Sequence, residues 1–183
     1  MAKLLICMAD GCEEIEALTV VDLARRAGLE IDMASISGKA DVTGSHKIKI
    51  GADKSLKDIN VNEYDGIILP GGMPGTNYLR ENARVIDIVK TFAKENKLVA
   101  AICAAPTVLG YAGVLQGKKA CCYPGMEDGL TGAEKKTEEV VKDGNIITSR
   151  GLGTAIPFAL AIIAHFEGEA KAKQISDSIV FCC

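Results

Sequence analysis

The strongest constraint on the fold is a repeated order along the chain, in which a short apolar run is followed by a helical pattern. The apolar runs lie at 3–8, 30–36, 64–69, 98–102 and 145–148, and the helical patterns at 13–27, 82–95, 104–112 and 154–166. Strands that alternate with helices are typical of a doubly wound α/β sheet that is mostly parallel, with helices on both faces. Residues 41–50 contain alternating polar and apolar side chains and no helical pattern, so they predict a small antiparallel excursion from the main sheet. The helix at 154–166 is apolar almost all round, so we expect it to be buried.

The chain is predicted to form a single domain over residues 1–183. This length is ordinary for one domain, and 48% hydrophobic residues suffice for a core. No linker, low-complexity stretch or internal repeat divides it.

Composition also narrows the class of function. The chain has 21 basic and 24 acidic side chains and a net charge of −3. This balance does not predict a basic surface for binding nucleic acid or a polybasic surface for binding a membrane. No apolar run approaches the roughly 20 residues of a membrane span. The first residues lead directly into the first strand without a signal peptide, which indicates a cytoplasmic protein.

The seven cysteines do not predict a disulfide framework or a metal site. An odd number of thiols in a chain without a signal peptide differs from the pattern of small secreted domains. The adjacent pairs 121–122 and 182–183 lack the spacer that zinc ligands need, and the chain has only two histidines. We therefore expect no metal, and most of these thiols to be small buried side chains.

Cys103 differs from the other cysteines in its position. It stands where the most apolar strand turns into a helix, and Ala101, Ala104 and Ala105 surround it. Such a sharp strand–turn–helix junction presents a reactive atom above the sheet. A helix start also favours an anion, so the thiol pKa is expected to fall from about 8.5 to about 3.5–7.5. Cys103 is the candidate nucleophile.

A histidine partner for this thiol is hard to find. His165 lies in the apolar helix and is interpreted as structural, and His46 lies in the excursion, from which it reaches a site only with help from the fold or a second subunit. A Cys-His-Asp triad is therefore not predicted.

A carboxyl group is the alternative partner, and the first strand–helix junction holds three glutamates. Glu13 and Glu14 fall at the helix start, where acidic residues compensate the helix dipole. If Ile15 and Leu18 face inward, Glu16 flanks the buried face. A desolvated, protonated Glu16 could donate a hydrogen bond to a thiolate. Such a pair suits attack on an electrophilic carbonyl and equally suits selective oxidation of the thiol.

Two glycine-rich turns invite a functional interpretation. The turn at 70–75 can bring backbone N–H groups to an oxyanion, although a plain tight turn explains it equally well. Residues 151–156 only partly imitate a dinucleotide loop, because Ile156 stands at the third glycine position. No nucleotide or other cofactor is expected.

Four ordered motifs resemble the ThiJ/PfpI superfamily, in the branch of the Parkinsonism-associated deglycase. They are Glu-Glu-Ile-Glu at 13–16, Leu-Pro-Gly-Gly at 69–72, Ala-Ala-Ile-Cys-Ala-Ala-Pro-Thr at 100–107 and Thr-Ser-Arg-Gly-Leu-Gly-Thr at 148–154. The resemblance implies a flavodoxin-like sheet, a homodimer, and a reactive cysteine paired with a protonated glutamate, which fall on Cys103 and Glu16. It places the oxyanion-type backbone donors on Gly72 and Ala104.

The activities that the resemblance implies are glyoxalase III-type conversion of methylglyoxal or glyoxal to a hydroxy acid, deglycation of their adducts, and redox-responsive chaperoning. None of these requires a cofactor. Basic family positions fall on Arg26 and His46, which are candidates for anion binding. Some members carry a histidine where this chain has Tyr123. That difference argues against protease or amidase activity and leaves glyoxalase-type turnover.

Two hypotheses of different class therefore remain open. The first is an enzyme whose small dicarbonyl substrate reacts with Cys103. The second is a non-enzymatic oxidative-stress sensor or chaperone that signals through oxidation of Cys103.

Overall fold

The computed structural model describes residues 1–181, so interpretations of Cys182 and Cys183 lie outside the described part. The strands are β1 (Lys3–Met8), β2 (Glu30–Ser35), β3 (Asp41–Thr43), β4 (Lys49–Gly51), β5 (Lys54–Ser55), β6 (Gly66–Leu69), β7 (Leu98–Ile102), β8 (Lys119–Ala120), β9 (Glu134–Lys135), β10 (Val140–Asp143) and β11 (Ile146–Ser149). The α-helices are α1 (Glu14–Ala27), α2 (Gly75–Glu81), α3 (Ala83–Lys94), α4 (Pro106–Tyr111), α5 (Ala155–Glu167) and α6 (Glu169–Ser178). Short 3₁₀ turns lie at Leu56–Asp58, Val61–Glu63, Glu127–Gly129 and Leu152–Thr154.

Seven strands form the central sheet in the order β10-β11-β7-β6-β1-β2-β5. Every neighbouring pair is parallel except β10 with β11. The chain extends the sheet from β1 toward β5 and then returns to β6 on the other side of β1. This is the predicted flavodoxin-like, doubly wound sheet, and β3 with β4 is the predicted antiparallel excursion. In such a sheet, sites form where the strand order reverses, beyond the carboxyl ends of the strands.

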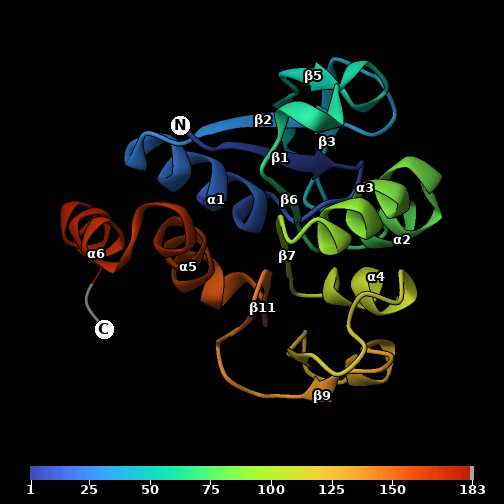
Figure 1. Cartoon of the computed structure of the whole chain (residues 1–183). Helices are drawn as coiled ribbons and strands as arrows, with labels where there is room; N and C mark the ends of the chain where they lie inside the picture. The colour runs from blue at the N-terminus through green and yellow to red at the C-terminus, as the bar shows by residue number, and fades with distance from the viewer. Residues whose placement is uncertain (182–183) are drawn as a thin grey trace.

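Helices cover both faces of the sheet (Figure 1). Helices α1, α5 and α6 pack against one another on one face, and α2, α3 and α4 lie on the other. The strand alternation follows this division. On β1, Leu4 and Ile6 point into the core beneath α1 and α5, whereas Leu5 and Cys7 point into the core beneath α3.

Helix α1 carries the first half of the candidate site. It ends at Gly28, whose φ of 88° is the left-handed conformation expected of a C-terminal glycine. The prediction that Ile15 faces inward is wrong, because its side chain is 48% exposed. The buried face of α1 is rotated and includes Glu14 and Glu16 instead.

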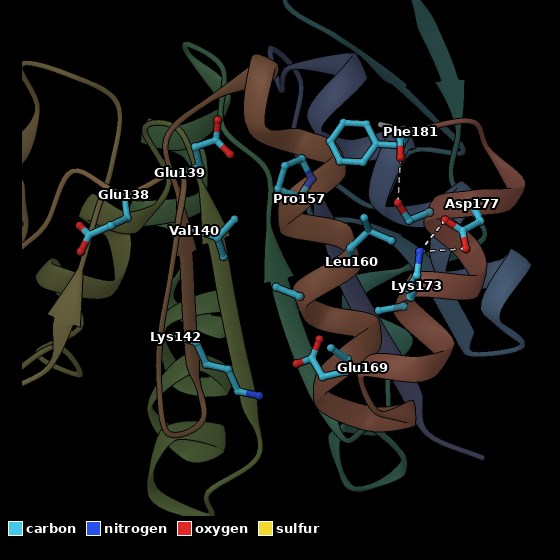
Figure 2. Close-up of a pocket in the computed structure, with 14 residues that line it drawn as sticks. Glu138, Glu139, Val140, Lys142, Pro157, Leu160, Glu169, Lys173, Asp177 and Phe181 are labelled. Atoms are coloured by element: carbon cyan, nitrogen blue, oxygen red, sulfur yellow. Dashed lines mark hydrogen bonds and ion pairs between the residues drawn. The ribbon is translucent and has the colours of Figure 1, made fainter. Parts of the chain in front are cut away.

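Helix α5 is less buried than its composition predicts. Phe158 and Ile162 lie in the core, but other apolar side chains line a groove of about 1080 Å³ between α5, α6 and β10. Figure 2 shows Val140 of β10 across this groove from Pro157 and Leu160 of α5. The cause is the edge position of β10, which leaves part of α5 without a covering strand. Within residues 1–181, every helix falls short of the length and apolarity of a bilayer-spanning segment.

Candidate active site at the strand-order reversal

The loops that follow β1, β6, β7 and β11 meet at one edge of the sheet. The Glu13 N–H donates to the Gly71 carbonyl at 2.9 Å, which joins the loops after β1 and β6. The Cys103 N–H donates to the Ser149 carbonyl at 3.0 Å, which joins the loops after β7 and β11. Backbone hydrogen bonds therefore fix the relative positions of these loops, as the parallel topology requires.

Cys103 stands in a strained turn directly after β7. Its φ is 65°, a left-handed conformation that residues with a side chain rarely adopt. The Tyr123 N–H donates to the Cys103 carbonyl at 2.8 Å, which holds the turn on its second side. The Cys103 side chain is half-buried, whereas the other described thiols are buried, namely Cys7, Cys12, Cys121 and Cys122.

Glu16 lies within α1 and faces Cys103 across Gly71. It is 1% exposed, and its Oε2 accepts the Gly71 N–H at 3.0 Å. The other oxygen, Oε1, is buried and accepts no hydrogen bond within residues 1–181. A side chain on residue 71 would meet both the Cys103 Cβ and the Glu16 Oε2, so a glycine is needed for this close approach.

Burial controls the protonation of Glu16. Loss of water raises the pKa of its carboxyl from 4.5 to about 7, and the negative charge of Glu13 acts in the same direction. The hydrogen bond from the Gly71 N–H and the proximity of the Cys103 thiol oppose this rise. Glu16 therefore holds its proton over much of the range up to neutral pH, which places a proton beside the sulfur.

The Cys103 thiol does not have the lowered pKa that its position at a helix start predicts. Burial is the main cause that raises its pKa to about 12, and the charge of an ionised Glu16 contributes to the same rise. The N–H groups of Ala104 and Gly72 lower the pKa but do not outweigh the loss of water. Both predicted backbone donors thus approach the sulfur.

Up to about pH 7, Glu16 is mostly protonated and stands beside a protonated Cys103. Because two negative charges in this buried space repel each other, the pair carries at most one charge near neutral pH. When it carries that charge, the remaining proton lies either on the thiol, beside a Glu16 carboxylate, or on the carboxyl group, beside a Cys103 thiolate. A carboxyl pKa near the working pH suits a group that repeatedly takes and returns a proton.

The neighbouring glutamates have roles that the sequence did not reveal. The Glu13 carboxylate caps α1 by accepting the Glu16 N–H at 2.7 Å. Glu14 is buried and accepts both the backbone N–H of His46 at 2.7 Å and the Nδ1 of its ring at 3.0 Å. Desolvation favours a raised Glu14 pKa, but these hydrogen bonds outweigh it and lower the pKa to about 2.

The remaining predicted residues lie near acidic or aromatic neighbours. Arg26 pairs with Asp22 at 2.6 Å on the exposed side of α1. Because His46 pairs with Glu14, the two candidate anion-binding residues each have an acidic partner, and anion binding stays a prediction. His165 is half-buried against Phe166, and burial lowers its pKa.

The chain is similar to known proteins over nearly its full length. The model of the DJ-1/PfpI family matches residues 2–165. Protein dj-1beta of Drosophila melanogaster is 38% identical over 178 residues, 96% of this chain and 95% of that protein. Protein DJ-1 homolog B of Arabidopsis thaliana is 39% identical over 175 residues, but this chain spans only 40% of that relative's length. The structure of oxidized Toxoplasma gondii DJ-1 has a TM-score of 0.95 and 37% identity, with 100% of both chains covered.

Proposed function

The chain belongs to the DJ-1/PfpI family, and from this premise we propose that it is a cysteine-dependent enzyme for reactive dicarbonyls. Its substrates are methylglyoxal, glyoxal or the adducts that these form. The observation that carries the proposal is the pair of Cys103 and a buried Glu16 with a pKa of about 7. This pair joins a nucleophile to a proton carrier, which are the two functions that the reaction needs.

The first step forms a bond between the Cys103 sulfur and the aldehyde carbon of the dicarbonyl. The thiol proton passes through Glu16 to the carbonyl oxygen, and the product is a hemithioacetal. Backbone N–H groups of Gly72 and Ala104 would stabilise negative charge on that oxygen as it develops.

The second step moves hydrogen within the adduct. The Glu16 carboxylate removes the proton from the former aldehyde carbon to give an enediol, and its acid form returns a proton to the neighbouring carbon. The result is a thioester of a hydroxy acid. Water hydrolyses it, which releases the hydroxy acid and restores the thiol. All atoms come from the dicarbonyl, water and these two side chains.

We also propose that the protein acts as a homodimer in the cytoplasm. Ile15 on α1 and Ile48 on the β3–β4 turn each expose about half of their surface, and apolar groups of this kind favour association. The five described cysteines are free thiols, as is usual in a reducing compartment.

The test compares methylglyoxal consumption by wild type, Cys103→Ser and Glu16→Gln. We expect Cys103→Ser to be inactive and Glu16→Gln to lose about 10²- to 10⁴-fold in rate, the range that a positioned acid–base group contributes. Cys122→Ser serves as the matched control, because Cys122 is buried. Wild type that consumes methylglyoxal no faster than Cys103→Ser would refute the proposal.

A redox sensor or chaperone is the second candidate. Its supporting observation is that Cys103 is half-buried while the four other described thiols are buried. Mild peroxide followed by peptide mass analysis is expected to add oxygen at Cys103 before any other thiol. If the protein lacks dicarbonyl turnover and still oxidises first at Cys103, the sensor explanation replaces the enzyme.

A further inference from the structure

Three large apolar side chains are exposed on the loops that meet around Cys103. Met73 is 51% exposed, Tyr123 is 51% exposed and Leu152 is 50% exposed. They come from three separate segments of the chain, which follow β6, β8 and β11. A single exposed apolar side chain is ordinary on a protein surface, but a group of them at one place indicates a binding surface.

Backbone contacts bring each of the three to the mouth of the site. Met73 follows Gly72, whose N–H approaches the Cys103 sulfur. Tyr123 donates its own N–H to the Cys103 carbonyl at 2.8 Å. Leu152 lies in the loop after β11, and the last carbonyl of that strand accepts the Cys103 N–H at 3.0 Å.

The Tyr123 ring lies against the loop that carries Leu152. A Cβ atom on Gly151 would lie 3.5 Å from Cδ2 and 3.9 Å from Cε2 of the Tyr123 ring. The ring therefore covers the backbone directly before Leu152. We call Met73, Tyr123 and Leu152 the apolar rim of the site.

The segments that carry the apolar rim have little charge. Residues 71–75, 121–124 and 149–153 contain no Asp, Glu or Lys, and their single Arg is Arg150. The Arg150 guanidinium donates to the Thr137 carbonyl at 3.1 Å, which ties its charge to the loop before β10. A substituent that reaches the rim therefore meets apolar surface, which favours an uncharged, apolar group.

The apolar rim is separate from the proposed dimer contacts. Those contacts use Ile15 on α1 and Ile48 on the β3–β4 turn, whereas the rim lies on the loops after β6, β8 and β11. Because substrate must reach Cys103 in the dimer, the mouth that the rim surrounds stays open on association.

We propose that the apolar rim makes the site selective for dicarbonyls that carry an aromatic or long alkyl group, an inference that rests on the proposed enzyme function. In that mechanism, the N–H groups of Gly72 and Ala104 face the oxygen of the attacked aldehyde, and the buried Glu16 carboxyl faces the hydrogen that moves. The group on the neighbouring carbon then occupies the solvent side, where the rim lies. Glyoxal has only hydrogen at this place, and methylglyoxal has one methyl group.

The test compares kcat/KM for phenylglyoxal and for methylglyoxal. We expect wild type to prefer phenylglyoxal by at least about tenfold, because even one methylene group in an apolar pocket is worth about 10- to 200-fold. Cys103→Ser is the blank, since it corrects for dicarbonyl that arginine side chains consume.

Polar replacement of the apolar rim should remove this preference. The double variant Met73→Gln/Leu152→Gln is expected to lower the ratio of the two kcat/KM values by about tenfold, and Tyr123→His should lower it in the same direction. Tyr111→His is the matched control, because Tyr111 is a 65% exposed tyrosine at the far end of α4 and should leave the ratio unchanged.

Alkylation of Cys103 measures the same selectivity without turnover. The measured quantity is the rate constant for N-phenylmaleimide divided by that for N-methylmaleimide, and glutathione gives the ratio for a free thiol. Peptide mass analysis assigns the adduct to Cys103. We expect the ratio for wild type to exceed that for glutathione by about tenfold, and the double variant to lose most of this excess.

The two measurements separate the apolar rim from the proposed enzyme. Turnover of both dicarbonyls without preference, or a preference that survives in the rim variants, would overturn the role of the rim and leave the enzyme standing. A maleimide ratio equal to that of glutathione would overturn the rim whatever the turnover. A raised maleimide ratio without any dicarbonyl turnover would support the rim and refute the enzyme.

Discussion

The substitution Glu16→Gln tests whether burial holds a proton on this side chain. Gln retains an oxygen that can accept the Gly71 N–H but cannot ionise. In the wild type, the Glu16 pKa of about 7 exceeds its ordinary value of 4.5. At about 1.4 kcal/mol per pH unit, this difference corresponds to about 3 kcal/mol of stability.

The sign of the effect follows from proton uptake. Between about pH 4.5 and 7, folded Glu16 keeps a proton that the unfolded chain has released, so the free energy of unfolding falls as pH rises. This contribution is complete below about pH 4.5 and is lost as pH passes the folded pKa. The stability of Glu16→Gln relative to wild type should therefore rise by about 3 kcal/mol from about pH 4.5 to pH 8.

Urea unfolding of both proteins across this pH range measures the difference directly. Cys103→Ser is the control, because it keeps Glu16 buried and should keep the pH dependence of wild type. Stability curves for wild type and Glu16→Gln that stay parallel would refute the reasoning. If Cys103→Ser removed the pH dependence as fully as Glu16→Gln, the proton would belong to the thiol.

Two further substitutions test the packing around the sheet. Gly71→Ala would place a methyl group against Cys103, and we expect the free energy of unfolding to fall by about 1–3 kcal/mol and Cys103 to lose its reactivity toward alkylating agents. Gly153→Ala is the control in urea unfolding, because a methyl group at that position meets nothing within 4 Å. Tyr64→Phe removes a 2.6 Å hydrogen bond from the buried Tyr64 hydroxyl to Asp32 and should cost about 1.5–3 kcal/mol by the same measurement. A loss below about 0.5 kcal/mol would mean that water replaces the Tyr64 hydroxyl.

The main elements could be predicted from sequence because their patterns are local. The apolar run Leu98–Ile102 became β7 at the predicted bounds, and the C-terminal glycine marked the end of α1 correctly. The strands β5, β8 and β9 have two residues each and carry no periodic signal. The helix predicted at 104–112 begins only at Pro106, because the left-handed Cys103 needs a turn before the helix starts.

The site was only partly accessible to sequence reasoning. The junction rule selects Cys103 but leaves three glutamates at the first junction. Glu16 was chosen from a helix phase with Ile15 inward, which is wrong, and from the family resemblance; the structure nevertheless brings Glu16 to Cys103 across Gly71. The raised thiol pKa could not be predicted, because it depends on the removal of water from a half-buried sulfur. The pairing of Glu14 with His46 was equally hidden, since hydrophobic periodicity does not report contacts between segments 32 positions apart.

Three glutamates within four positions show how strongly environment separates chemically equal groups. Glu13 caps the helix, Glu14 accepts from the ring and the backbone N–H of His46 and has a lowered pKa, and Glu16 accepts one backbone N–H and has a raised pKa. The negative charge of Glu13 contributes to the rise at Glu16. The acidic turn therefore has a chemical consequence beyond compensation of the helix dipole: its charge helps to keep a proton on the one carboxyl that faces the sulfur.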